Sequence, residues 1–473
     1  MDNYYQINTD TRPKPWYTKI SVEPVMFLYM ASYMLSTVVE QAFFVHKACT
    51  VDLRLPADTC AAINTEEHKE DYKKVQIVVS TFHQYESWAS HAVPMILAFY
   101  MGAWSDRVGR KLPMLLGLVG SVIYWAALLL NSLQDSWSLQ MVLYTATFPA
   151  ALTGGSLAIF MSAVSYVCDI TSPAERTVRV TLLEVAYLIT MPVGVAVGSY
   201  LFKQVMGQSF TCMFLLSGAL MMTALIYAIL RLEWCTNKTK QTAPVSCAGT
   251  VVDTIRVVTK SRTNHYSCYL RLIIIAMAFY TFQRDEKNMA YLYTTLKFNW
   301  DIQTYSTFRT FQSSLYILGL LLGAPVVGKL LGLRDTVIVM VGSVSHFVAR
   351  AIFATTSHPV GFYIGATLGG LGPVTAPVLR SITSKLVPIS ERGKALSLLS
   401  VADTSVPIIS GTIYSQLYNA TINTVPAAIF WVTATSQLLV FLSALTIHCI
   451  QGEQPLEQAQ DPLEEAKPVS SET

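Results

Sequence analysis

Ionisable residues inside otherwise apolar stretches are the strongest candidates for chemistry in this sequence. Glu184 lies within VTLLEVAYLITMPVGV, and Arg380 follows the glycine- and proline-rich stretch GGLGPVTAPV. A charge near the centre of a membrane helix costs about 2.5 to 3.5 kcal/mol on insertion scales, so such a residue usually serves a function. We expect Glu184 to bind a proton or a substrate; the alternative is a structural pairing with a buried arginine. We expect Arg380 to contact an anionic group, because a guanidinium stays charged and binds carboxylates in a fork; the alternative is a cationic anchor near the inner end of its helix.

His83 and Glu86 form a second candidate proton site. Residues three positions apart share one face of a helix, so the two side chains can meet. A histidine titrates near neutral pH, and a carboxylate removed from water binds its proton more tightly. The pair therefore predicts proton uptake and release during a transport cycle. The alternative is that both residues line a wet outer vestibule or cap groups of a loop.

Further charges lie in predicted helices. Glu40 and Arg350 are candidates for substrate binding. His346 and Arg350, four residues apart, have the alternative of pairing with acids on a neighbouring helix. The run Arg284–Lys287 places four charges together, which a continuous lipid-facing helix cannot hold. Two interpretations of this run remain: the helix is unwound beside a cavity, or it ends early and the charges are solvated outside.

The composition places these charges in a membrane protein. Of the 473 residues, 52% are hydrophobic and only 13% are charged, about half the charged fraction of a soluble domain. Long segments contain no Asp, Glu, Lys, Arg or His: Leu112–Leu133, Ser136–Cys168 and Gln204–Leu230. Each exceeds the roughly 20 residues that cross a bilayer, and must be helical to satisfy its backbone. The net charge of +3 and the absence of a basic run argue against nucleic acid as a partner. No Walker loop, nucleophile elbow or metal signature appears, so we expect no enzyme activity, bound cofactor or metal.

Breaks in the hydropathy predict an all-α polytopic protein with twelve membrane helices. The predicted spans are 22–46, 76–101, 112–133, 138–168, 178–203, 209–231, 269–296, 306–331, 335–355, 360–387, 394–418 and 425–450. The longest interior gap divides them into two halves of six. The predicted domains are a tail at 1–21, a first half at 22–231, a linker at 232–268, a second half at 269–450 and a tail at 451–473.

Loop charges predict the orientation. Lysine and arginine gather in the loops of one side, which contain Arg107, Arg110, Lys111, Arg176, Arg179, Lys329, Arg334, Lys385, Arg392 and Lys394. Because basic loops stay in the cytoplasm, both termini and the linker are expected there. The loop 47–75 then lies outside and contains Cys49 and Cys60, for which a disulfide is expected, with two free thiols as the alternative. The sequon at Asn419 also falls outside and predicts N-glycosylation.

An internal repeat supports the division into halves. GAWSDRVGRKLPMLLGLVG from Gly102 resembles GAPVVGKLLGLRDTVIVMVG from Gly323, and SPAERTVRVTLLEVA from Ser172 resembles PISERGKALSLLSVA from Pro388. The two pairs are separated by similar lengths of chain. Transporters built from two six-helix halves show this kind of weak internal symmetry.

GAWSDRVGRK is the most specific short motif. Asp106 faces the bases Arg107, Arg110 and Lys111 across a tight turn, a charge cluster that can bond neighbouring helices in one state and release them in another. It resembles the loop signature of the major facilitator superfamily, a gating element. The alternative is a solvated basic loop. Three residues in or beside the repeated segments are also expected to act in gating: Asp169, Arg176 and Arg392.

Several segments resemble solute carrier family 46 of that superfamily: Ser21-Val-Glu23-Pro24-Val, GAWSDRVGRK, AVSYVCDITSPAERTVRVTLLE and APVLRSITSKLV. The resemblance runs from about residue 20 to 450. It implies a major facilitator fold and, for the family's folate member, proton symport of folates across the plasma membrane. Glu184 matches a helix-five glutamate tied to proton coupling in that member. Arg380 matches a helix-ten arginine implicated in proton and substrate binding there.

The chain also departs from the folate member. Its fourth predicted helix reads TATFPAALTGG and lacks an arginine and an aspartate found there; TFQRDEK in the seventh lacks a histidine. No cysteine lies between Lys287 and Thr310, so the family's bridge to the loop between helices seven and eight cannot form. The Cys49–Cys60 bridge is the remaining option. The segments quoted above support membership of the family, whereas these departures argue against assigning folate as the substrate.

The predicted function is proton-coupled symport of an organic anion, folate-like or muropeptide-like, by alternating access between the halves. The expected partners are the lipid bilayer and that small molecule, with a proton gradient in place of a cofactor. The expected location is the plasma membrane; Tyr4-Tyr5-Gln6-Ile7, a tyrosine-based sorting pattern, favours the lysosomal membrane as the alternative. The alternative functions are a lysosomal exporter of small metabolites and a non-transporting receptor on the same fold. No pattern in the sequence predicts an oligomeric state.

Overall fold

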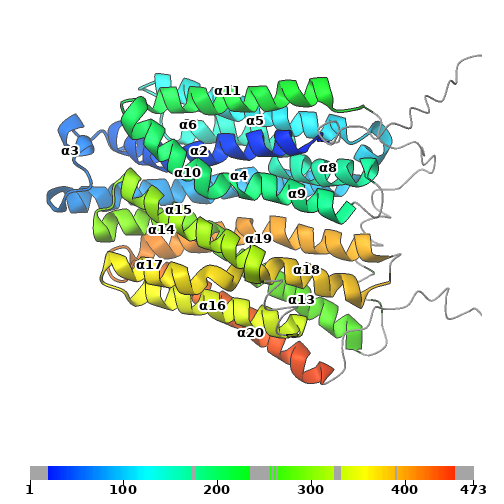
Figure 1. The fold of residues 1–473 in the computed structure, drawn as a ribbon. Coiled ribbons are helices and arrows are strands. Elements are labelled where there is room, and N and C mark those ends of the chain that lie inside the picture. Colours follow the sequence, from blue (N-terminus) through cyan, green and yellow to red (C-terminus); the bar gives the residue numbers. More distant parts are fainter. Residues whose placement is uncertain are drawn as a thin grey trace, which may run out of the picture.

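The structure is a computed structural model that describes residues 20–171, 176–234, 256, 260, 265–323, 332–388 and 391–452. The predicted tails, most of the linker and the Tyr4–Ile7 pattern lie outside these residues. All regular elements among the described residues are helices (Figure 1).

The helices up to residue 231 make up what we term the first half. They are α2 (Glu23–Lys47), η1 (Ala48–Asp52), α3 (Ala57–Ala61), η2 (Glu66–His68), α4 (Lys69–Val108), α5 (Lys111–Leu133), α6 (Gln140–Val142), η3 (Leu143–Thr147), α7 (Phe148–Leu152), α8 (Gly155–Ile170), α9 (Arg176–Leu188), α10 (Thr190–Tyr200), η4 (Leu201–Val205) and α11 (Phe210–Arg231). Within a span, α-helix passes into π-helix at η3 and η4 without leaving the membrane segment. A π-turn of this kind widens the helix locally and often marks a functional site.

The helices from residue 266 onward make up the second half. They are α13 (Tyr266–Thr281), α14 (Gln283–Phe298), α15 (Ile302–Leu318), η6 (Gly319–Gly323), α16 (Asp335–Thr355), α17 (Pro359–Leu368), η8 (Gly369–Val374), α18 (Thr375–Leu386), α19 (Arg392–Thr421) and α20 (Ala428–Gln451). The glycine-rich η8 is a 3₁₀ segment with Pro373 inside it. It interrupts the helix just before the segment that contains Arg380.

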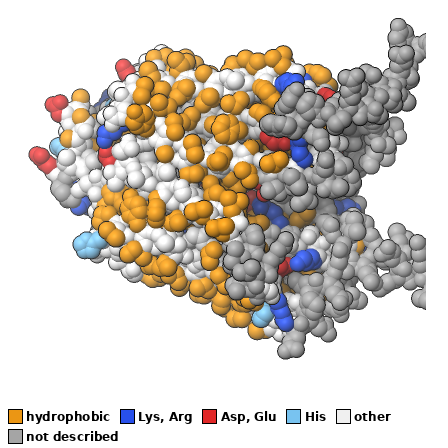
Figure 2. All heavy atoms as spheres, viewed as in Figure 1, with side chains coloured by type: hydrophobic (Ala, Val, Ile, Leu, Met, Phe, Trp, Pro, Cys, Tyr) orange, Lys and Arg blue, Asp and Glu red, His pale blue; other side chains and the backbone are white. Residues whose placement is uncertain are grey.

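Apolar side chains cover the middle of the molecule. Among the described residues, eight helical segments are long and apolar enough to cross a membrane. The other predicted spans coincide with α2, α4, α13–α14 and α15, which are less apolar or are interrupted. Figure 2 shows hydrophobic side chains over the middle of the visible face, and charged side chains toward its two ends. Large hydrophobic side chains are exposed on the membrane helices: Ile96 of α4 is 67% exposed, and Leu230 near the end of α11 is 76% exposed. The chain is therefore a multi-pass membrane protein.

The structure corrects both interpretations of the run Arg284–Lys287. α13 ends at Thr281 and α14 begins at Gln283, so a single residue, Phe282, separates them. The four charges occupy the first turns of a helix that continues to Phe298. The segment is neither unwound at the charges nor ended there: Arg284 and Glu286 form ion pairs with other helices, and Asp285 accepts a hydrogen bond from Ser410.

The segment between α2 and α4 lies at the end of the molecule that is predicted to face outward, which we term the outer end. Cys49 and Cys60 are joined by a disulfide with a Cα–Cα distance of 5.9 Å, which ties η1 to α3. The Asp52 carboxylate accepts a hydrogen bond from the Leu139 N–H at 3.0 Å, and partial burial raises the pKa of this carboxyl. Asn419 lies near the outer end of α19, where its amide nitrogen donates to Thr81 at 3.1 Å. Its glycosylation stays a prediction.

Candidate transport site

The two halves are joined along α4 and α19. Ser80 and Ser415 approach with their hydroxyl oxygens 3.0 Å apart, and the Gln416 amide donates to Gln84 at 2.7 Å. Ser87 donates to the carbonyl oxygen of Pro407 at 2.7 Å. We term these contacts the outer seal. Among the described residues, every hydrogen bond between the halves lies at the level of Trp88 or further toward the outer end.

Close helix contact at the outer seal depends on Gly411. A Cβ atom placed on Gly411 would lie 2.8 Å from both Cβ and Oγ of Ser87, closer than such atoms pack in proteins. The missing side chain therefore lets α19 approach α4 and lets Ser87 reach Pro407. The two halves are therefore closed against each other at the end of the molecule that carries the Cys49–Cys60 disulfide.

Asp403 on α19 gathers charged and polar groups from three other helices. The Arg284 guanidinium of α14 and the Thr281 hydroxyl of α13 both donate to Asp403 Oδ1 at 2.8 Å. The Arg380 guanidinium of α18 lies 3.7 Å from Asp403 Oδ2. We term these four residues the Asp403 cluster. Arg284 and Arg380 each keep 47% of their side chains exposed, whereas the Asp403 side chain keeps 19%.

Glu184 and Arg380 act on the same tyrosine from the two halves. Glu184 is exposed on α9 and forms no ion pair or hydrogen bond with any residue that the structure describes. Tyr187, one turn further along α9, packs edge-on against Phe160 and interacts electrostatically with both Glu184 and Arg380. Glu184 and Arg380, which belong to different halves, are therefore both within electrostatic range of Tyr187.

His83 lies between two oxygen acceptors. Its Nδ1 is 2.8 Å from Glu86 Oε2, and its Nε2 is 2.8 Å from Gln41 Oε1. The two contacts hold the imidazole between α4 and α2. Asn288 of α14 lies 3.5 Å from Nδ1, so the pair adjoins the second half.

Glu40 lies close to this pair. The Tyr124 hydroxyl donates a hydrogen bond to Glu40 Oε1, and the charges of Glu86 and Lys287 act on the same carboxyl. Glu40 is thus tied to α5 of the first half, and Lys287 of α14 lies within electrostatic range of it.

Arg350 is placed differently from its predicted role. Its Nε lies 3.2 Å from Glu286 Oε1, and each of the two side chains is only 5% exposed. Arg350 also donates to the Tyr316 hydroxyl at 3.2 Å and lies over the Phe353 ring. The geometry favours the alternative of an ion pair with a neighbouring helix, because the guanidinium is nearly buried and its Nε and Nη1 already donate to Glu286 and Tyr316.

Two of the residues predicted to act in gating form an ion pair with each other. Arg110 Nε donates to Asp169 Oδ2 at 3.0 Å, which joins the start of α5 to the end of α8. Lys111 donates to the carbonyl oxygens of Ile229 and Leu232 at 2.7 Å each, at the end of α11. The side chains of Asp106, Arg107, Arg176 and Arg392 lie outside the described residues. Among the described residues, the contacts of Arg110 and Lys111 given above join α5 to α8 and α11 of the first half.

The sequence assigned no joint role to Arg284 and Asp403, which the fold brings together. The available signal was Pro407, four residues after Asp403. Proline has no N–H, so the Asp403 carbonyl oxygen loses its helical partner. Arg284 Nη1 lies 3.4 Å from that oxygen.

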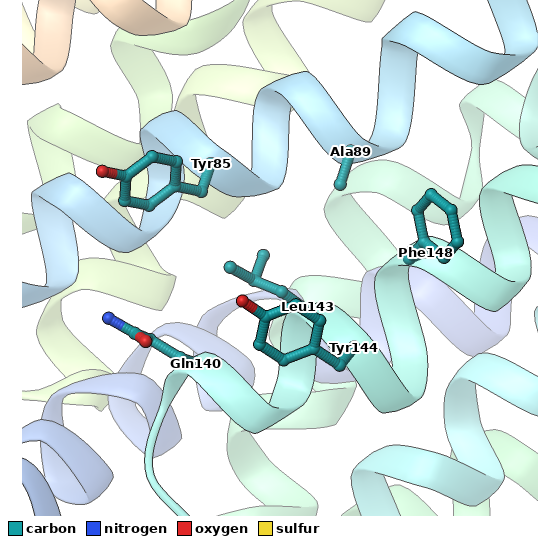
Figure 3. A pocket seen from close by; sticks show the side chains of 6 residues that line it. All are labelled: Tyr85, Ala89, Gln140, Leu143, Tyr144 and Phe148. Atoms are coloured by element: carbon teal, nitrogen blue, oxygen red, sulfur yellow. The ribbon is translucent and has the colours of Figure 1, made fainter.

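A pocket lies on another part of the first half. Figure 3 shows it between α4 and the segment from α6 to α7, with a volume of about 380 Å³. Its lining residues are Tyr85, Ala89, Gln140, Leu143, Tyr144 and Phe148. It shares no lining residue with the charged groups above and is therefore not part of the candidate site.

The chain matches a known protein family and several known transporters. The model of the Major Facilitator Superfamily matches residues 87–307 and 273–472. The chain is 22% identical over 427 residues to the probable peptidoglycan muropeptide transporter SLC46 of Drosophila melanogaster, covering 86% of this chain and 81% of that protein. It is 24% identical over 458 residues to the proton-coupled folate transporter of Rattus norvegicus, covering 92% of each.

A solved structure confirms the fold. The crystal structure of a D-xylose–proton symporter superposes with a TM-score of 0.66 at 12% identity, covering 94% of this chain and 100% of that one. This likeness concerns the fold alone, and it confirms the predicted all-helical architecture. The chain therefore belongs to the Major Facilitator Superfamily, whose members are membrane transporters that need no cofactor and are not enzymes, and its relatives named above are members of solute carrier family 46.

Proposed function

We propose that the protein is a proton-coupled symporter of an organic anion, working by alternating access between its two halves. The observation that carries this proposal is the exposed Glu184 carboxylate, which has no partner among the described residues and shares Tyr187 with Arg380 of the opposite half. An unpaired carboxylate inside a membrane is costly unless it binds a proton or a ligand. Both relatives are named as transporters, and the name of one of them states that it is proton-coupled; these names support proton-coupled transport.

The residues divide into three roles in this proposal. Glu184 takes up the proton that drives transport, and the His83–Glu86 pair is a second proton site next to the outer seal. Arg380 contacts the anionic group of the substrate, with Glu40 on the facing wall. The Arg110–Asp169 pair belongs to the inner gate, together with Asp106, Arg107, Arg176 and Arg392.

The halves themselves are part of the proposal. Residues 22–231 and 269–450 would rotate against each other, with 232–268 as a cytoplasmic linker. The hydrogen-bonded outer seal, together with the exposed Glu184 of α9 and Arg380 of α18, supports a conformation that is open toward the cytoplasm. We propose the plasma membrane as the location; surface biotinylation of intact cells tests it, and recovery of the protein in lysosomes alone would overturn it.

The experiment is uptake into proteoliposomes containing the full-length protein. Folic acid and a muramyl dipeptide are supplied at about pH 5.5 outside and about pH 7.4 inside, with and without a protonophore. We expect at least one of them to accumulate only with the gradient. Accumulation that is unaffected by the protonophore, or none at all with either compound, would count against the proposal.

Glu184→Gln separates coupling from binding. The amide keeps the size of the side chain but cannot take up a proton. We expect gradient-driven accumulation to fall by at least about tenfold while exchange of substrate across the membrane at equal pH is retained, because exchange needs no net proton movement. The matched control is Glu70→Gln, whose carboxylate forms an exposed surface pair with Lys73. Full acid-stimulated accumulation by Glu184→Gln would remove Glu184 from this role.

A further inference from the structure

The pocket shown in Figure 3 lies on a surface of the first half that faces lipid. Its lining residues all belong to α4 or to the segment from α6 to α7, and none of them carries a charge. In that segment Tyr144, Phe148 and Leu152 follow one another at every fourth position and keep 68%, 47% and 55% of their side chains exposed. An exposed apolar stripe along one face of a membrane helix is typical of contact with lipid. The pocket therefore opens toward the bilayer.

The pocket lies at the level of the outer seal. The Trp88 indole of α4 donates to the Thr412 hydroxyl of α19 at 2.8 Å, and Tyr85 packs edge-on against Trp88 with the ring centroids 5.7 Å apart. On the other wall, Gln140 is the first residue of α6 and follows Leu139, whose N–H binds Asp52 at the outer end. From Gln140 to Phe148 the helix axis rises by about 12 Å, less than the roughly 15 Å of hydrocarbon in one leaflet. The pocket therefore lies within the outer leaflet.

The pocket has a polar end and an apolar end. Figure 3 shows the Tyr85 hydroxyl and the Gln140 amide at one end, with the Tyr144 hydroxyl turned toward them, and Ala89 and Phe148 at the other. We term Tyr85, Gln140 and Tyr144 the polar end. Among the residues that the structure describes, none of these three side chains has a hydrogen-bond partner. A polar group next to hydrocarbon is costly unless it is hydrogen-bonded, so this end suits a ligand that both donates and accepts a hydrogen bond.

A π-turn and a small side chain shape the apolar end, which consists of Ala89, Leu143 and Phe148. In η3 the Phe148 N–H donates to the carbonyl oxygen of Leu143, five positions earlier. In an α-helix two such residues are turned about 140° apart, whereas a π-turn brings them into line. Leu143 and Phe148 therefore line the same pocket. On α4, Ala89 leaves the space that a larger side chain would fill, and the volume of the pocket is about 380 Å³.

The lining favours a sterol over a phospholipid. Phosphate groups bind to lysine and arginine, and the pocket contains neither. A sterol has one uncharged hydroxyl, which both donates and accepts, at the end of a rigid apolar ring system. The flat rings of Tyr144 and Phe148 offer a surface for such a ring system. A rigid ligand also loses less conformational freedom on binding than a flexible acyl chain does.

We propose that this pocket binds a membrane sterol from the outer leaflet. The sterol hydroxyl bonds to the polar end, and the ring system lies along the apolar end. The pocket shares no lining residue with the candidate transport site, so the sterol is a bound lipid and not the transported compound. The proposal therefore does not depend on the proposed function.

The test is photolabelling of the purified full-length protein in phosphatidylcholine vesicles. The probe is a cholestanol analogue that carries a diazirine on its ring system and keeps its hydroxyl. Mass spectrometry of the digested protein locates the label, which we expect on the peptides that contain Ala89 and Phe148. With the probe near saturation, a roughly tenfold excess of unlabelled cholesterol should lower this labelling by at least about fivefold, because both sterols compete for one site.

Two variants test the two ends of the pocket. Ala89→Leu fills the apolar end and should lower the labelling by at least about fivefold, because the ring system and the new side chain need the same space. Gln140→Leu removes a donor and an acceptor from the polar end and should lower it by about threefold or more, the loss expected for one hydrogen bond. The matched control is Ala126→Leu, at an exposed position of α5 outside the pocket, which should leave the labelling unchanged. Thermal unfolding of each purified variant shows that it is folded.

Three results overturn the inference. One is label spread evenly over the exposed apolar residues of the membrane helices, or label that excess cholesterol does not displace. Another is a folded Ala89→Leu protein that is labelled like the wild type, or an equal loss of labelling in Ala126→Leu. The third is a phosphatidylcholine with a diazirine in its acyl chain that labels the same two peptides and is not displaced by cholesterol, because the occupant is then an acyl chain.

Discussion

Replacing Gly411 with alanine should open the outer seal. The new Cβ would lie 2.8 Å from Cβ and Oγ of Ser87, so the two helices cannot keep their present separation. Overpacking of this kind costs about 1 to 3 kcal/mol. The strain exists only when α4 and α19 are in contact, so it acts on the outer-closed state alone. A difference of that size shifts the ratio of outer-open to outer-closed molecules by roughly 5- to 150-fold.

The assay is labelling of a cysteine at position 80 by a membrane-impermeant maleimide. Ser80 is fully buried in the seal, so Ser80→Cys reacts only when the outer side opens. Cys212 is exposed in the parent protein and is first replaced by serine to lower the background. With opening fast relative to labelling, the labelling rate reports the open population, and Gly411→Ala should raise it by roughly 5-fold or more.

A matched glycine in the first half serves as the control. A Cβ on Gly218 would meet only Trp125 Cβ at 3.6 Å, an ordinary contact, so Gly218→Ala should leave the labelling rate unchanged. Ser87→Gly in the Gly411→Ala protein removes the atoms that overlap and should return the rate toward that of the parent. An unchanged rate in Gly411→Ala, or an equal rise in Gly218→Ala, would refute the close-contact argument.

Two further predictions concern stability. Glu286→Gln leaves the 5%-exposed Arg350 without its counter-charge and should lower the free energy of unfolding by about 3 to 5 kcal/mol. The control Glu70→Gln removes an exposed ion pair and should change the free energy of unfolding by about 1 kcal/mol or less. Equal midpoints in thermal unfolding of the two purified variants would show that the Arg350–Glu286 pair is not buried as described. Cys60→Ser opens the disulfide, which spans a sequence separation of 11, and should cost roughly 3 kcal/mol of loop-closure entropy. The same thermal measurement, with and without reductant, checks it, because a reductant that shifts the Cys60→Ser variant as much as the wild type would contradict the assignment.

Features set by neighbouring residues could be predicted from the sequence. His83 and Glu86 meet at 2.8 Å because a spacing of three residues on a helix brings side chains together whatever surrounds them. The membrane spans were predictable for the same reason, since hydropathy is a property of consecutive residues. Glu184 was expected to be isolated, and it has no partner within the described structure.

Features set by distant residues could not be predicted. The interpretation of Arg284–Lys287 was wrong because hydropathy counts four charges in a row and cannot see their partners. Asp403 and Ser410 of α19 bind Arg284 and Asp285, while Arg350 of α16 binds Glu286. The predicted role of Arg350 depended on the same missing information. A buried ion pair and a substrate-binding arginine look alike until the acid on the other helix is located.

Pro407 links two events that would otherwise be independent. Its carbonyl oxygen accepts the hydrogen bond from Ser87 in the outer seal, and its missing N–H frees the Asp403 carbonyl for Arg284. One turn of α19 thus holds both the lock of the outer side and the charge cluster. Such linkage is reciprocal: if a ligand that binds Arg284 destabilises the closed outer seal by a given free energy, then closing the seal weakens the binding of that ligand by the same free energy. An inhibitor that clamps the outer side shut should therefore change the affinity for substrate at the inner side, without ever touching it.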